Sequence, residues 1–184
     1  MNQMQYRRQL AEIKWGDNLK KFKCQHTKDG KKCGYHIAIR QPDYSMKCAK
    51  CKCVESATAH TAFHGLGIDL DTAMNILFAI QSHWQEYIRS HELANRQGEQ
   101  ARLSVRDLAL MFKIEPKMVW RFLNRIIDWL PKSYYKKNNS VDEVWFQGVD
   151  KKNRLRYYAL YNFLIESSDS EYLEILCNKK PHQN

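Results

Sequence analysis

Four of the six cysteines stand in two pairs whose spacing suits a metal ion. Cys48 and Cys51 form a C-x-x-C pair, which presents two thiolates from one turn of the chain to one ion. Cys24 and Cys33 form a second pair, although eight residues separate them, where about two to four are usual. Tetrahedral zinc takes four sulfur or nitrogen ligands. The sequence therefore predicts one structural zinc ion bound by Cys24, Cys33, Cys48 and Cys51.

Other donors close to these pairs leave the ligand set open. The gap within the first pair, QHTKDGKK, is polar and turn-forming, so it could bulge out and return its second cysteine to the metal. Cys53 could replace Cys51 as a ligand, and His26 or His36 could replace a member of the first pair. Cys177 stands alone, and we interpret it as a core or surface thiol.

The composition favours a folded chain in a reducing compartment. The first ten residues contain no apolar segment of the kind that a secretory signal peptide has, so we expect no disulfides. No apolar run approaches membrane-spanning length, and we therefore expect no membrane partner and a cytoplasmic, nucleoid-associated location. Hydrophobic residues make up 43% of the chain, enough for packed cores.

Positive charge is concentrated on the part of the chain that bears the cysteines. The net charge is +10, and residues 1–68 contribute +8 of it, with 13 Lys and Arg against 5 Asp and Glu. A basic module gains affinity for a polyanion by releasing counterions, which makes nucleic acid the leading partner. A basic surface that only keeps the protein soluble is the alternative.

Hydrophobic periodicity predicts short elements around the cysteines and helices after them. The cysteine-bearing unit is too small to bury a core of its own, so a metal would supply much of its folding free energy. We expect helices at 4–14, 72–92, 154–165 and 170–177, strands at 35–40, 44–47 and 141–149, and a basic linker at 131–140.

Residues 104–130 have the pattern of a helix-turn-helix. Ser104 and Asp107 form a capping box, and Pro116 suits the first position of the second helix. Lys113 falls in the turn, where a left-handed residue with a Cβ costs about 1 kcal/mol. The apolar positions expected to face inward are Leu108, Ala109, Phe112, Ile114, Val119, Phe122, Leu123 and Ile126.

The second helix of this motif could read DNA. In a major groove, its outward residues near the N-terminus would contact base edges. Arg121 could form a bidentate contact with guanine, and Asn124 with adenine. An ordinary helical hairpin with a solvated charged face is the alternative. The predicted DNA-binding residues are Lys117, Trp120, Arg121, Asn124 and Arg125.

Five motifs in a fixed order point to one family. LAEIKWGDNLKKFKC ends at Cys24, KCG follows at 32–34, and CAKCKCVES begins at Cys48. TAHTAFHG at 58–65 is similar to a T-x-G-T-x-F-H element, with His60 in place of a glycine, and SVRDLALMFKIEPKMVWRFLNRI holds Trp120. Over about residues 6–130, the chain resembles the zinc-ribbon, helix-turn-helix transposases of bacterial insertion sequences that have an acidic-triad nuclease domain.

The resemblance also has implications for catalysis. Such transposases begin a ribonuclease-H-like domain with a strand bearing V-D-E, and VDEVWFQGVDKKN looks like that strand, with Asp142 at the metal-binding position. A complete domain needs two further acidic residues on a full sheet, which hold two metal ions. Only about forty residues follow Asp142. The resemblance therefore implies that Asp142 is a remnant, that most of the catalytic domain is lacking and that no residue is catalytic.

We predict an α+β, mainly helical fold. Its parts are an N-terminal helix at 1–19, a zinc ribbon at 20–68, a helical module at 69–131 with the helix-turn-helix, and a linker with a C-terminal extension at 132–184. The predicted function is zinc-dependent binding of double-stranded DNA by a transposase-derived protein, with a protein partner or a homodimer as a further option. The alternatives are a transposase completed by another chain, acting as a Mg²⁺-dependent strand transferase, and a zinc-ribbon protein–protein adaptor.

Overall fold

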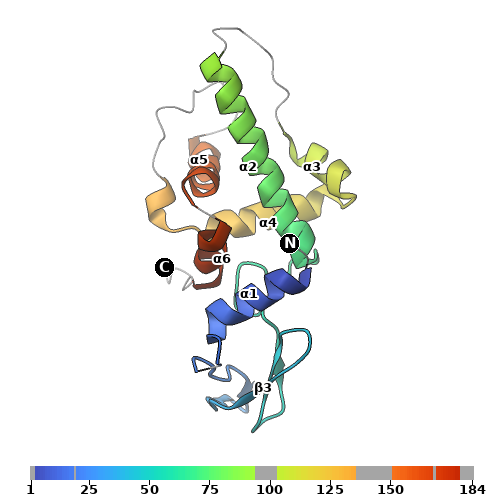
Figure 1. The fold of residues 1–184 in the computed structure, drawn as a ribbon, viewed down its shortest axis with the longest axis vertical. Helices are drawn as coiled ribbons and strands as arrows, with labels where there is room; N and C mark the ends of the chain where they lie inside the picture. Colours follow the sequence, from blue (N-terminus) through green and yellow to red (C-terminus); the bar gives the residue numbers. More distant parts are fainter. Residues whose placement is uncertain (1–2, 19, 94–102, 136–150, 168, 179–184) are drawn as a thin grey trace. The chain divides into compact units, whose positions relative to one another are not determined.

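The protein has a mixed α+β fold that is mainly helical, as predicted (Figure 1). Contacts divide the chain into two compact units, of which the first comprises residues 1–65 with 173–184 and the second residues 66–172. The boundary near the C-terminus falls within helix α6, Asp169–Asn178. The computed structural model describes residues 3–18, 20–93, 103–135, 151–167 and 169–178.

The first unit contains one helix and several very short strands. Helix α1, Gln3–Trp15, buries Tyr6, Leu10 and Trp15. Strands β1 and β2 form a hairpin, and β3, β4 and β5 form an antiparallel sheet in that order. The bounds are β1 Thr27–Lys28, β2 Lys31–Lys32, β3 Ala38–Arg40, β4 Met46–Cys48 and β5 Val54–Glu55. The strands predicted at 35–40 and 44–47 correspond to β3 and β4, which are shorter or shifted by one to three residues.

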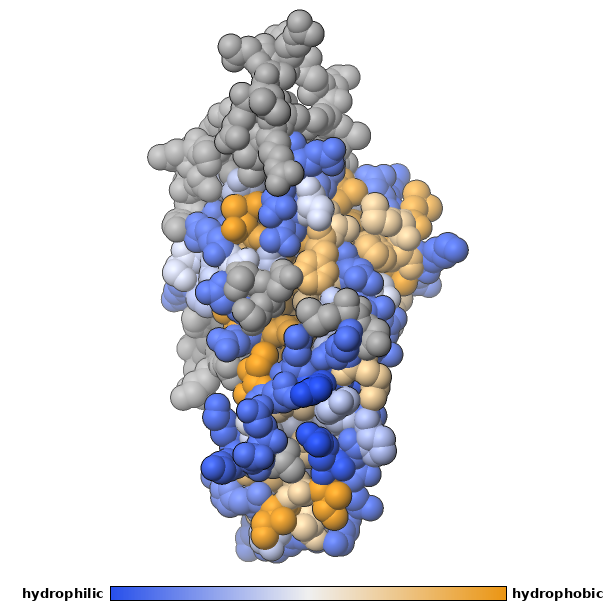
Figure 2. Space-filling model, viewed as in Figure 1, coloured by the Kyte–Doolittle hydropathy of each residue, from blue (hydrophilic) through white to orange (hydrophobic). Residues whose placement is uncertain are grey.

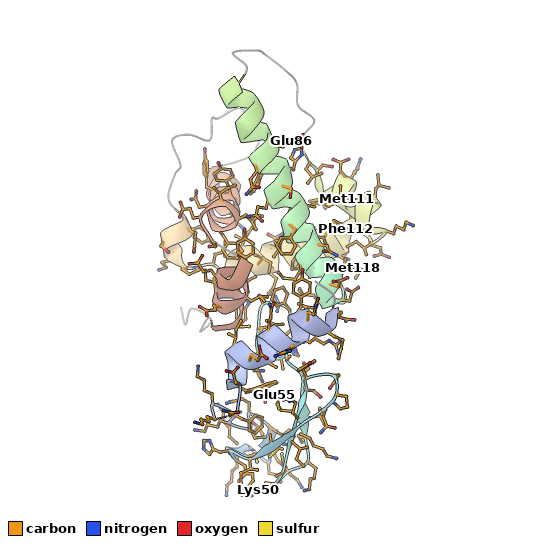
Figure 3. All side chains as sticks on the ribbon, viewed as in Figure 1. Lys50, Glu55, Glu86, Met111, Phe112 and Met118 are labelled. Atoms are coloured by element: carbon orange, nitrogen blue, oxygen red, sulfur yellow. The ribbon has the colours of Figure 1, made fainter. Side chains whose placement is uncertain are left out.

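A half-buried ion pair joins α1 to the end of the sheet. Lys14 Nζ lies 2.7 Å from Glu55 Oε1 on β5 and donates a hydrogen bond of 2.6 Å to the carbonyl oxygen of Ala59. Figure 3 shows Glu55 between α1 and the strands. Burial lowers the pKa of Lys14, although the pairing with Glu55 opposes this effect. The pair therefore fixes the direction in which the chain leaves β5.

The β3–β4 hairpin explains which side chains face the inside of the first unit. Tyr44 adopts a left-handed φ of 61°, and Asp43 Oδ1 accepts hydrogen bonds from the Ser45 amide and hydroxyl groups. This closes the turn between β3 and β4. Side chains alternate along β4, so that Met46 and Cys48 are buried while Lys47 is exposed.

The second unit is built from helices alone in its described part. Helix α3 packs on α2 and α4, and α5 packs on α2, α4 and the 3₁₀ helix η1. Asp69 caps α2 by accepting a 2.8 Å hydrogen bond from the Thr72 amide. The helices are α2 Leu70–Leu93, α3 Val105–Phe112, α4 Pro116–Trp129, η1 Lys132–Tyr135 and α5 Lys151–Glu166. Most of the apolar side chains that they bury recur at helical spacing.

The chain after α4 differs in part from the prediction. Residues 131–140 were predicted to be a linker, but η1 occupies 132–135 and is held by hydrogen bonds. Asn162 Nδ2 donates to the carbonyl oxygen of Tyr134 at 2.8 Å, and the Tyr135 hydroxyl donates to that of Ile127 at 2.6 Å. These tertiary partners explain why a polar, basic stretch is ordered. The strand predicted at 141–149 lies outside the described residues.

None of the described helices combines the length and the apolar character needed to cross a membrane.

Candidate metal centre and nucleic-acid interface

Four cysteine sulfurs come together in the first unit. Cys24 Sγ lies 3.6 Å from Cys51 Sγ, Cys33 Sγ lies 3.9 Å from Cys48 Sγ, and all four sulfurs lie within 4.8 Å of one another. A disulfide would bring two sulfurs to about 2.0 Å, so these are free thiols. Sulfurs bound at about 2.3 Å to a tetrahedral ion are about 3.8 Å apart. The four cysteines could therefore hold a metal ion.

The second pair of cysteines is positioned by a tight turn, residues 48–53, which we call the second knuckle. The Lys52 amide donates to the carbonyl oxygen of Cys48 at 3.0 Å, and the Cys48 amide donates to that of Cys53 at 2.9 Å. Lys52, which follows the second cysteine, has a left-handed φ of 64°. The turn brings Cys48 and Cys51 to the same point and directs the chain back into β5.

The first pair has the same backbone pattern in residues 24–35, which we call the first knuckle. The Gly34 amide donates to the carbonyl oxygen of Cys24 at 3.1 Å, and the Cys24 amide donates to that of Tyr35 at 2.9 Å. Gly34 again follows the second cysteine and has a φ of 60°. Each knuckle thus uses the same two hydrogen bonds and one left-handed residue to present two sulfurs.

The eight-residue gap of the first knuckle is a small hairpin. Strands β1 and β2 pair with Thr27 opposite Lys32, and Asp29 and Gly30 both have positive φ, 51° and 74°. This is the backbone of a type I′ turn, which favours Asp-Gly. The Cys33 amide donates to the carbonyl oxygen of His26 at 2.8 Å. The polar gap therefore bulges out and returns Cys33 to the cluster, as the sequence predicted.

The surroundings of the sulfurs shift the pKa values of the cysteine thiols in opposite directions. Burial raises the pKa of Cys48, but the backbone amides of Cys51 and Lys50 lower it more, and the result is about 7. Burial raises the pKa of Cys24 to about 12. A metal ion binds thiolates, so binding at neutral pH would release protons, chiefly from sulfurs such as that of Cys24.

The three alternative ligands, Cys53, His26 and His36, do not all lie together. Cys53 stands where Tyr35 stands in the first knuckle, and with His26 and Cys51 it forms a second group whose donor atoms lie within 4.8 Å of one another. His36 Nδ1 lies 3.2 Å from the carbonyl oxygen of Phe22, and within the described residues it belongs to neither group.

Cys177 has no part in either group of the described residues. It is buried in α6, and burial raises its pKa to about 12. It is therefore a core thiol, one of the two roles expected from its isolated position.

The α3–α4 hairpin has the local structure that the sequence predicted. The Ser104 amide donates to Asp107 Oδ2 at 2.7 Å, and the Asp107 amide donates back to Ser104 Oγ at 3.2 Å. Lys113 is left-handed, with φ 54° and ψ 44°, and the Ile114 amide donates to the carbonyl oxygen of Ala109 at 3.0 Å. Phe112 and Ile114 were expected to face inward, but both are only half-buried.

Helix α4 has one buried and one exposed face. Pro116 occupies its first turn. Four of the predicted DNA-binding side chains are exposed, namely Lys117, Trp120, Arg121 and Arg125. The buried positions are Val119, Phe122, Leu123, Ile126 and Ile127. Polar and aromatic groups therefore lie on the side opposite the core, as expected for a surface helix.

Asn124 departs from the prediction that it faces DNA. It is half-buried, its Nδ2 donates to the carbonyl oxygen of Trp120 at 2.8 Å, and its Oδ1 accepts from Arg156 Nη2 at 2.8 Å. Arg156, on α5, also pairs with Asp128 at 2.8 Å. The amide thus has both of its ends engaged within the protein, which leaves it poorly placed to make a bidentate contact with adenine.

Met118 is half-buried, although it lies in the first half of α4 close to the exposed side chains. A Cβ added at Gly67 would lie 3.5 Å from Met118 Cε, so this half-buried side chain packs on the chain just before α2 (Figure 3).

Exposed apolar side chains were missed at the sequence level. Ile37, Ile39 and Val54 are each about 60% exposed in or beside the three-stranded sheet, and Leu110 and Met111 are 79% and 57% exposed on α3. Figure 2 shows orange side chains over both places. Ile37 and Ile39 are two residues apart, so the strand predicted at 35–40 could have placed them on one face.

Comparison of the chain with models of protein families, with curated proteins and with solved structures finds no match.

Asp142, the acidic residue of the V-D-E stretch, lies outside the described residues. The next described element is helix α5, which begins at Lys151.

Proposed function

We propose that this chain is a zinc-dependent, transposase-derived protein that binds double-stranded DNA through a helix-turn-helix formed by α3 and α4. The observation that carries the proposal is the two-sidedness of α4. Val119 and Phe122 have no exposed surface, whereas Trp120 is 56% exposed and Arg121 is exposed beside it. A recognition helix needs this arrangement, because one face must hold it to the protein while the other contacts base edges.

The position of these side chains on α4 supports the same assignment. Lys117, Trp120 and Arg121 lie in the first half of the helix, the part that enters the major groove in helix-turn-helix proteins. The N-terminus of the helix also carries a partial positive charge, which favours a phosphate nearby. In this proposal Arg121 contacts guanine, while Lys117 and Arg125 contact phosphates.

Zinc is the ion that we propose for the four cysteines. A tetrahedral set of four sulfurs suits zinc or iron, and zinc is the usual structural ion in small cysteine knuckles. The same segment is strongly basic on its surface, which would add phosphate contacts along the duplex. The exposed basic residues are Lys20, Lys21, Lys23, Lys28, Lys31, Lys32, Arg40, Lys47, Lys50 and Lys52.

We assign no nuclease activity to the chain. Residues 151–166 form a helix, at the place where the family's ribonuclease-H-like sheet would continue with a strand. A nuclease of that kind needs several carboxylates on one sheet to hold its metal ions. Mg²⁺-dependent nicking of plasmid DNA that disappears in Asp142→Ala would contradict this part of the proposal and favour a strand transferase completed by another chain.

The DNA-binding proposal is tested with duplexes selected from a random pool by the purified full chain. Arg121→Ala should weaken binding to the preferred duplex by about 1–3 kcal/mol and relax the preference at one base pair. Lys117→Ala should weaken binding equally across sequences and lower the salt slope by about one. Arg8→Ala is the matched control, because Arg8 on α1 already pairs with Glu12 at 2.7 Å.

The exposed apolar residues favour a second candidate, a protein–protein adaptor. Ile39 lies opposite Lys47, and Lys47 lies opposite Val54, so these three side chains share the outward face of the sheet. Such a face is more usual in protein interfaces than in phosphate contacts. A chain that binds no duplex at low salt would favour the adaptor, whereas DNA affinity that falls steeply with salt would support the main proposal.

A further inference from the structure

We infer that this chain has a second metal position, formed by His26, Cys51 and Cys53 and linked to the four-cysteine site through a shared sulfur. One ring nitrogen and two sulfurs of these residues lie within 4.8 Å of one another. Cys51 Sγ belongs to both groups of donors. A thiolate has enough lone pairs to bind two ions, so Cys51 would bridge the two positions.

The backbone holds both additional donors in place. His26 lies next to β1, and its carbonyl oxygen accepts the Cys33 amide at 2.8 Å, which ties it to the first knuckle. The carbonyl oxygen of Cys53 accepts the Cys48 amide at 2.9 Å, and the left-handed Lys52 sets the direction of the chain before it. The knuckle folds that form the first site therefore also bring His26 and Cys53 to Cys51.

A bridged pair of ions fits this geometry better than an exchange of ligands within one site. The Cys24–Cys51 and Cys33–Cys48 sulfur separations, 3.6 and 3.9 Å, already match a tetrahedron without Cys53. Cys53 also stands at the position that Tyr35 holds in the first knuckle, and tyrosine is no ligand there. One divalent ion among four thiolates leaves excess negative charge, which would attract a second cation to the shared sulfur.

The donors indicate which class of ion would bind. Two sulfurs and one imidazole nitrogen form a soft set with three donors, which suits thiophilic ions such as Cd²⁺ or Cu⁺. His26 is exposed, and Cys51 and Cys53 are half-buried, so the position opens to solvent and is incomplete without a fourth ligand. We therefore expect the second ion to bind more weakly than the first.

The inference rests on the four-cysteine metal site of the proposed function, and it is tested on the full chain with Cd²⁺. Native mass spectrometry should count two Cd²⁺ per wild-type chain and one in Cys53→Ser and in His26→Ala. Cys177→Ser, which removes a buried thiol from α6, is the matched control and should keep two. ¹¹³Cd NMR should give two resonances that are coupled through the shared sulfur.

Each contrary outcome has a separate meaning. One Cd²⁺ in the wild-type chain, or two in both Cys53→Ser and His26→Ala, would overturn the second position. Two resonances without coupling would overturn the bridge through Cys51. A chain that binds no Cd²⁺ at all would overturn the four-cysteine site itself, which is a failure of the proposed function and differs from the loss of only the second ion.

Discussion

The two units of the molecule differ in what stabilises each of them internally. In the first unit the strands have only two or three residues, and Ile37, Ile39 and Val54 remain largely exposed. In the second unit helices of 8 to 24 residues bury continuous apolar faces, including Phe122 and Ile126 on α4. Four cysteine sulfurs converge beside these short strands. The comparison indicates that an ion held by these sulfurs would add to the small core around α1, whereas the described helices of the second unit pack on one another.

Both units nevertheless use one backbone device. Lys52 closes the second knuckle and Lys113 closes the α3–α4 turn, and both lysines adopt left-handed angles with φ of 64° and 54°. The strain of a Cβ at such a position is similar in the two places. What holds each strained turn differs, because the cysteine sulfurs lie beside the turn at Lys52, whereas packed helices adjoin the turn at Lys113.

The largest expected effect is loss of the metal. Cys48→Ser, or removal of the ion by a chelator, should unfold the cysteine-bearing segment, because structural zinc contributes about 10–16 kcal/mol in small domains. Metal content by mass spectrometry should fall to none, and limited proteolysis should cleave within residues 20–56. Helicity by circular dichroism should be largely retained. Collapse of the helical signal together with the metal would show that the two units depend on the same ion.

Truncating a core side chain in the second unit should destabilise the helices and leave the metal content unchanged. Phe122 has no exposed surface, so Phe122→Ala should lower the free energy of unfolding of the helices by about 3–5 kcal/mol. Denaturant unfolding followed by circular dichroism measures this change, and metal content should stay the same. Trp120→Ala, on the exposed side of the same helix, is the control and should change stability by no more than about 0.5 kcal/mol.

Local features of both units could be predicted from the sequence, whereas tertiary partners could not. The C-x-x-C pair, the bulge before Cys33 and the cap at Ser104 depend on neighbouring residues, and the structure places each as expected. Asn124 differs because its partner, Arg156, lies 32 residues further along the chain. The start of the predicted linker is ordered as η1 for the same reason, since Asn162 on α5 holds it.

A smaller effect should come from relieving the two left-handed lysines. Lys113→Gly and Lys52→Gly should each stabilise their own unit by about 1 kcal/mol, because glycine adopts these angles without strain. Denaturant midpoints measure the first change, and metal affinity under chelator competition measures the second. Arg121→Gly, at an exposed position in the interior of α4, is the control and should destabilise by about 1 kcal/mol. A loss of stability in Lys113→Gly would mean that its side chain makes a needed contact.

The smallest effect concerns the helix caps in acid. Hydrogen bonds from Thr72 lower the pKa of Asp69, and those from Ser104 lower the pKa of Asp107, each below the ordinary value of 3.8. Their stabilising contribution is therefore complete above about pH 4 and is lost as the pH falls through the lowered values. Thermal unfolding of the helices between pH 7 and 2 should show it, and the drop should be shallower in Asp69→Asn with Asp107→Asn.

The hairpin between Cys24 and Cys33 makes the first knuckle permissive to change in length. Its base is fixed by the hydrogen bond between the Cys33 amide and the His26 carbonyl oxygen, while its tip at Asp29 and Gly30 is exposed. Residues added at the tip would leave the base closed, so the sulfurs would keep their positions. An epitope or a fluorescent label could be grafted there, and in evolution the same tip could lengthen without disturbing coordination.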